Sequence, residues 1–182
     1  MGKTLTSLTS RLVDFIGEQP IFFVATAMGE GRINLSPKGM DSLRVLDENT
    51  LLWLNLTGSG NETATHLMEQ ARITLMWCAF EGDPIILRAY GRAKTYREGS
   101  DFWERHIGLF PDYAGSRQLV DVDIERVLVS CGMGVPLMQY QGERDMLEPW
   151  ARGLGEEGMK TYRQNKNTQS LDGHPTDIPL EK

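Results

Sequence analysis

The sequence predicts a mainly β fold, an antiparallel β-barrel of about six strands with helices at its periphery. Extended runs rich in β-branched and aromatic residues recur between residues 21 and 131. Tight turns that contain glycine, proline, aspartate or asparagine join many of these runs, which indicates that neighbouring strands run antiparallel. The length and number of the strands favour closure of the sheet into a barrel.

The elements follow in the order helix, strands with two inserted helices, and a helical tail. Apolar residues between Leu5 and Ile16 recur at three- and four-residue steps, which predicts a first helix capped by Thr4 or Ser7. Further helices are predicted near residues 60–70 and 100–110. The strand regions are 21–27, 33–39, the pair 45–46 and 50–56 joined by a turn at Asp47-Glu48-Asn49, 71–80, 84–96, with a bend or bulge at Gly91, and 124–134.

We interpret residues 1–182 as a single domain, because the sequence contains neither internal repeats nor low-complexity segments. Residues 21–131 form the predicted barrel core. Residues 141–182 form a C-terminal extension whose helix is interrupted by Pro149 and several glycines.

Composition and charge count against several classes of function. A net charge of −6 without a Lys/Arg cluster counts against nucleic acid as the main partner. No segment approaches the roughly 20 apolar residues of a membrane span, and the first residues lack an apolar core of secretory length. Cys78 and Cys131 lie in apolar runs without metal-ligand spacing, which predicts buried free thiols and a cytoplasmic location.

Motifs for catalysis by protein side chains alone are missing from the sequence. It has no Walker loop, dinucleotide-binding glycine fingerprint, HExxH or nucleophile elbow. The three histidines, His66, His106 and His174, are too scattered to predict a zinc site, and no metal-binding residue is predicted. The missing motifs favour a cofactor that brings its own chemistry.

Four features occur together between residues 10 and 96. They are the hairpin with Arg32 and Ser36-Pro37-Lys38-Gly39, the strand TLLWLN, a serine-containing loop that opens a helix, and the Arg-Ala-Tyr-Gly-Arg-Ala strand that starts at Arg88. In order and spacing they resemble the pyridoxamine-phosphate-oxidase-like family of flavin-binding proteins. The resemblance implies a six-stranded split β-barrel with flanking helices, FMN as cofactor and oxidoreductase activity.

The loop Thr57-Gly58-Ser59-Gly60-Asn61 is the predicted phosphate site. Such a loop offers backbone amides, a hydroxyl and the positive end of a helix, although an ordinary capped loop has the same composition. In the family pattern a Ser-Arg-Lys run contacts the flavin phosphate, and here this run reads Ser59-Gly60-Asn61 without either cation. Arg32, Lys38 or Arg88 would have to replace the missing charge. The predicted cofactor-binding residues are Arg32, Ser36, Pro37, Lys38, Gly39, Asn55, Leu56, Ser59, Gly60, Asn61 and Arg88, and no catalytic residue is predicted.

The cofactor is expected to lie outside the barrel, because so small a barrel is filled by its own side chains. The resemblance implies a groove between two symmetric subunits, and therefore a homodimer with two equivalent sites. An FMN-dependent oxidoreductase that acts on an unidentified small molecule is the leading interpretation. The alternatives are a non-catalytic protein that binds flavin or deazaflavin, and a haem-handling split barrel that uses one of the three histidines as axial ligand.

Overall fold

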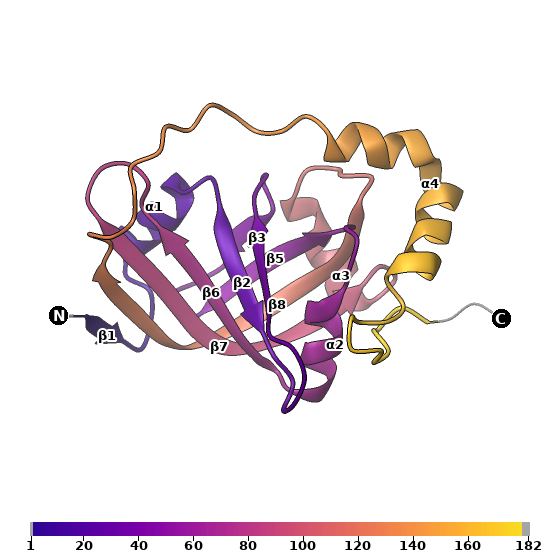
Figure 1. Cartoon of the computed structure of the whole chain (residues 1–182), viewed down its shortest axis with the longest axis horizontal. Helices are drawn as coiled ribbons and strands as arrows, with labels where there is room; N and C mark the ends of the chain where they lie inside the picture. The colour runs from indigo at the N-terminus through magenta and orange to yellow at the C-terminus, as the bar shows by residue number, and fades with distance from the viewer. Residues whose placement is uncertain (1, 180–182) are drawn as a thin grey trace.

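The computed structural model describes residues 2–179 and contains eight strands and four α-helices within them (Figure 1). The strands are β1 (Lys3–Leu5), β2 (Phe22–Thr26), β3 (Asn34–Lys38), β4 (Leu43–Val45), β5 (Thr50–Leu56), β6 (Arg72–Cys78), β7 (Ile85–Arg97) and β8 (Ser116–Cys131). The helices are α1 (Ser10–Glu18), α2 (Glu62–Glu69), α3 (Asp101–His106), which continues into a 3-10 turn (η1, Ile107–Leu109), and α4 (Leu147–Lys166).

Seven strands form a continuous antiparallel path in the order β3-β2-β6-β7-β8-β5-β4, and β1 adds to it by pairing with β8. The edge strands β3 and β4 are joined by residues 39–42 alone. A flat sheet of seven strands would separate its edges by about 29 Å, whereas the five residue steps from Lys38 to Leu43 span at most about 18 Å. The sheet must therefore curl until its edges approach, which confirms the antiparallel split barrel with one more strand on the path than predicted.

The inner face of the curled sheet holds the main core. Phe22 packs edge-on against Trp53 and stacks with Trp77, with ring centroids 6.2 and 6.1 Å apart. Leu12 and Phe15 of α1 belong to the same buried cluster, so this helix closes one end of the barrel. A second cluster lies on the outer face, where α3 and the following turn cover β5 and β8; it contains Leu52, Leu54, Trp103, Phe110 and Leu119.

Three sequence-based predictions were wrong. The first helix starts at Ser10 because residues 3–5 are extended and pair with residues 127–129, a contact that local periodicity does not reveal. The last strand starts at Ser116 instead of residue 124, since residues 118–123 pair with both β5 and β7; the sequence pattern missed this part because it begins with polar residues, of which Arg117 and Gln118 are buried. Cys131 is exposed, whereas Cys78 is buried as predicted.

The C-terminal extension crosses the barrel and returns to it. After β8, residues 132–146 run as an extended arm across one end of the sheet and lead into α4 on the opposite side (Figure 1). The helix is kinked at Gly155, whose φ of 66° is left-handed, and Pro149 lies in its first turn. No helix within residues 2–179 is long and apolar enough to span a membrane.

The bulge predicted at Gly91 is present and yields a test of the fold. The β7–β8 register shifts between Tyr90 and Gly91, and a Cβ at Gly91 would lie 2.0 Å from the carbonyl oxygen of Asp123. We expect Gly91→Ala to lower the free energy of unfolding by about 1–3 kcal/mol, because the clash is with backbone. In urea denaturation, the control Gly17→Ala, with open space around it, is expected to be neutral or stabilising. Equal effects would contradict the required close approach.

Candidate functional site

A pocket of about 470 Å³ lies where β3, the end of β5, the loop 57–61 and the first turn of α2 meet β8. Asn34, Ser36 and Lys38 of β3 line it together, because alternate residues of a strand point to one side. They pair in register with Thr26, Val24 and Phe22, which are buried in the barrel. The pocket therefore opens at the split between the two sheet edges, and we call it the split pocket. Its lining residues are Asn34, Ser36, Lys38, Asn55, Leu56, Gly58, Ser59, Gly60, Asn61, Glu62, Thr63, Arg117 and Leu171.

Two positive charges occupy this pocket with little water around them. Arg117 is 6% exposed and donates from one terminal nitrogen to the carbonyl oxygen of Gly60 (3.0 Å) and to Oδ1 of Asn167 (2.7 Å). Burial lowers the pKa of Arg117 to about 10. Burial and the nearby Arg117 guanidinium lower the pKa of Lys38 to about 8, and the Lys38 ammonium lies 5.0 Å from the centre of the Trp53 ring.

Residues from the C-terminal extension complete the split pocket. Asn167 is fully buried, and its Nδ2 donates to the carbonyl oxygen of Gly58 (2.9 Å). Asp177 accepts hydrogen bonds from Gln118 Nε2 and from Asn61 Nδ2, the latter at 3.5 Å. The extension therefore fixes the loop 57–61 and places a carboxylate beside it.

Three buried side-chain atoms in the described part of the chain lack a hydrogen-bond partner, and all three belong to residues that line the split pocket. They are Ser36 Oγ, Asn61 Oδ1 and Arg117 Nε. A buried polar group left unpaired costs about 1–3 kcal/mol, so native structures contain few of them. Asn61 also occupies the N-cap position of α2 without capping it. The pocket therefore offers a hydroxyl, a guanidinium N–H and an amide oxygen to a polar ligand.

The structure brings seven of the eleven predicted cofactor-binding residues into the split pocket: Ser36, Lys38, Asn55, Leu56, Ser59, Gly60 and Asn61. Pro37 and Gly39 line a neighbouring cavity instead. Arg32 lies in the turn between β2 and β3 and forms an ion pair with Asp172. Arg88 lies on β7 and donates to the hydroxyl of Ser130 (3.2 Å). Two arginines that the predicted site did not include contact the loop directly: Arg117 donates to the carbonyl oxygen of Gly60 and Arg163 to the hydroxyl of Thr57, both at 3.0 Å.

The histidines do not gather around one centre. His66 is buried, with Nδ1 3.0 Å from the hydroxyl oxygen of Thr26. His106 stacks on Phe102, and its Nδ1 lies 2.8 Å from the carbonyl oxygen of the same residue. Within residues 2–179 no three His, Cys, Asp or Glu residues are placed to hold a metal ion.

The sequence model of pyridoxamine 5'-phosphate oxidase matches residues 8–131, more than half of the chain. The chain belongs to the pyridoxamine 5'-phosphate oxidase family. Members of this family generally bind a flavin. The matched region contains every strand of the seven-strand path, whereas Asn167 and Asp177 lie outside it.

Individual relatives support the family and the fold. The pyridoxamine 5'-phosphate oxidase family protein ustO of Aspergillus flavus is 32% identical over 189 residues, which cover 93% of this chain and 75% of that protein. A proposed pyridoxamine 5'-phosphate oxidase from Lactobacillus delbrueckii has a similar structure, with a TM-score of 0.55, 21% identity, and coverage of 68% of this chain and 94% of that one. The structure of HupZ from Group A Streptococcus gives a TM-score of 0.53, 22% identity, and coverage of 66% of this chain and 91% of that one.

The hydrogen bonds of Asn167 predict that the extension stabilises the split pocket of this family member. We expect Asn167→Ala to lower the free energy of unfolding by roughly 1–3 kcal/mol, because it leaves the carbonyl oxygen of Gly58 and one guanidinium N–H of Arg117 with a partner fewer. Asn165→Ala serves as the control, because Asn165 is exposed in the last turn of α4, two residues before Asn167. Chemical denaturation of both variants measures the difference, and equal stabilities would show that Asn167 does not anchor the loop.

Proposed function

We propose that this chain binds FMN in the split pocket and acts as an FMN-dependent oxidoreductase on a small organic molecule. The observation that carries the proposal is the set of three unpaired buried polar atoms, which lie with two cations in one pocket of a protein whose family generally binds flavin. The Ser36 hydroxyl, the Arg117 N–H and the two cations suit a phosphate monoester, because they combine positive charge with hydrogen-bond donors, whereas Asn61 Oδ1 would accept from a donor elsewhere on the ligand. The two unpaired cysteines support the cytoplasmic location expected from the sequence.

The phosphate of FMN would be held by the loop 58–61 together with Lys38 and Arg117. The loop opens α2, so its amides lie at the positive end of that helix, and Ser59 adds a hydroxyl. Lys38 supplies an ammonium, and the guanidinium of Arg117 is fixed by hydrogen bonds to uncharged oxygens of Gly60 and Asn167. Because those partners are neutral, they orient Arg117 without neutralising it, and the Asp177 carboxylate compensates its charge only in part.

Bound flavin supplies the redox chemistry by accepting or donating a pair of electrons, commonly as a hydride. The protein side chains bind and orient. Ser36 presents an unpaired hydroxyl, and Asn55 is fixed by the hydrogen bond from its Nδ2 to Gln118 Oε1 (2.9 Å). Leu171, from the C-terminal extension, adds an apolar side chain to the lining of the pocket.

The proposal predicts a difference between two flavins. We expect Lys38→Met to weaken FMN binding about ten-fold and to leave riboflavin unaffected, because the variant removes one charge-assisted contact to phosphate. Flavin fluorescence titration measures both affinities. Arg32→Ala is the matched control and is expected to leave both affinities unchanged. The sequence predicts Arg32 as a phosphate ligand, but in the structure it pairs with Asp172 outside the split pocket. Equal losses for both flavins, or none with Lys38→Met, would contradict this placement of the phosphate.

We also propose that the protein is a homodimer. Several large apolar side chains are exposed on β3, beside it and on the first part of the arm 132–146, where a second copy would cover them: Ile33, Leu35, Met133 and Leu137. An interface above about 1,000 Å² is typical of a stable complex. We therefore expect light scattering to give twice the chain mass at micromolar concentration. A monomer mass under these conditions would contradict the dimer.

A further inference from the structure

A second and larger cavity of about 1010 Å³ adjoins the split pocket, and Lys38 lines both. We call it the arm cavity, because residues 138–144 of the extended arm form one wall. The end of α1, residues 37–40 and the turn at residues 80–82 form the others. The Met138 N–H donates to the carbonyl oxygen of Phe80 (2.9 Å), and the Tyr140 N–H donates to the Glu81 carboxylate (3.3 Å), so the arm is tied to this turn.

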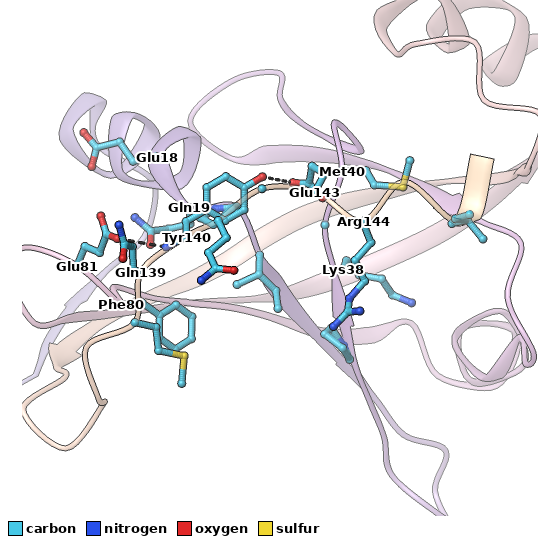
Figure 2. Close-up of a pocket in the computed structure, with 18 of the residues that line it drawn as sticks. Glu18, Gln19, Lys38, Met40, Phe80, Glu81, Gln139, Tyr140, Glu143 and Arg144 are labelled. Atoms are coloured by element: carbon cyan, nitrogen blue, oxygen red, sulfur yellow. Dashed lines mark hydrogen bonds between the residues drawn. The ribbon is translucent and has the colours of Figure 1, made fainter. Parts of the chain in front are cut away.

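Charged side chains are distributed unevenly along the arm cavity. Figure 2 shows Glu18 and Glu81 at one end and Lys38 and Arg144 toward the other. Within residues 2–179 none of these four residues takes part in an ion pair. The backbone hydrogen bond to Glu81 leaves its negative charge uncompensated. The cavity therefore has an acidic end and, bordering the split pocket, a basic end at which the two cations outnumber the carboxylate of Glu143.

The wall between the two ends is largely apolar and adaptable. Met138 and Met146 are 53% and 68% exposed, and Phe80 and Met40 line the same cavity. Methionine side chains are flexible and polarisable, so they pack against ligands of varied shape. Tyr140 adds an aromatic ring, whose hydroxyl donates to the Glu143 carboxylate (2.9 Å). That hydrogen bond raises the pKa of the Tyr140 hydroxyl.

We propose that the arm cavity is the substrate site and that its substrate is an elongated zwitterion with an apolar middle. A protonated amine of the substrate would face Glu18 and Glu81, its apolar body would contact the methionines and Phe80, and a carboxylate would face Lys38 and Arg144. The assignment as a substrate site rests on the proposed flavin site, because Lys38 brings the carboxylate end to the border of the split pocket. Binding itself needs only the cavity and its charges.

Three probes of equal chain length separate the contributions of the two charges: 8-aminooctanoate, octylamine and octanoate. Calorimetric titration of the full-length protein, with and without FMN, measures their affinities. We expect 8-aminooctanoate to bind at least about ten-fold more tightly than either singly charged probe, because it alone meets both charged ends. Equal affinities for the three probes, or no binding of any probe, would overturn the proposal. No binding of any probe is the result expected if a second copy of the chain fills the cavity.

Two variants locate the charged ends. The double variant Glu18→Gln/Glu81→Gln is expected to abolish the preference for 8-aminooctanoate over octanoate, and Arg144→Gln the preference over octylamine. Glu125→Gln is the control, because Glu125 is exposed on β8 and lies outside the arm cavity. The assignment would be overturned if the control also lost a preference, or if neither the double variant nor Arg144→Gln lost one.

Failure of this proposal and failure of the flavin proposal give different results. The affinity for FMN, measured by fluorescence in the same variants, is expected to stay within about two-fold of wild type, because none of the substituted residues lines the split pocket. If FMN does not bind, the calorimetric series on the flavin-free protein still decides whether the arm cavity takes a zwitterion. If FMN binds and the probes show no preference, the substrate proposal alone is wrong.

Discussion

The short connection between the two edge strands is the constraint on which the architecture depends. Residues 39–42 join β3 to β4 and force a seven-strand sheet to curl. Met40 adopts a left-handed φ of 60° there, a conformation uncommon for residues other than glycine. Ser42 stabilises the turn, since its hydroxyl donates to the Gly39 carbonyl (2.7 Å) and its N–H to the Met40 carbonyl (2.9 Å). Lys38 immediately precedes this turn, so the same constraint places its side chain where both cavities meet.

The positive charges of Lys38 and Arg117 favour binding of an anion in the split pocket. Two cations lie in a partly dehydrated site. Burial and the charge of Arg117 lower the pKa of Lys38, and burial and the charge of Arg163 lower the pKa of Arg117. Lys38 remains mostly protonated at neutral pH, because its pKa of about 8 still lies above it. An anion would stabilise the charged form and so raise this pKa, which means that binding and protonation favour each other. Asp177 supplies partial compensation in the free protein, since its carboxylate raises the pKa of Arg117.

Local sequence patterns predicted the features that depend on neighbours in the chain. Alternating apolar residues gave the strands, Ser100 capped the predicted helix by accepting from the Trp103 N–H (3.3 Å), and Gly91 marked the bulge. Features that depend on distant partners were missed. In sequence, residues 3–5 resemble part of the helix that follows, but in the structure they form a strand that pairs with β8. The guanidinium of Arg117 is covered by partners that are distant in sequence, namely the loop 57–61 and Asn167 at the end of α4. One sequence signal could have indicated this position: Arg117 and Gln118 stand directly before a strand of alternating apolar residues.

The position of Arg117 accounts for the most unusual feature of the loop. In the family pattern that the chain resembles, cations follow the serine, whereas here Gly60 and Asn61 occupy those positions. The guanidinium of Arg117, which comes from β8, donates to the carbonyl oxygen of Gly60. A positive charge therefore lies beside a loop position where the family pattern has a cation and this chain has glycine. Such an arrangement needs support, because a buried arginine must satisfy its donors at fixed angles. Asn167 gives that support from outside the family-matched region, by accepting from Arg117 and donating to Gly58. The C-terminal extension is therefore part of the split pocket, because it fixes the guanidinium of Arg117 beside a loop that carries no cation of its own.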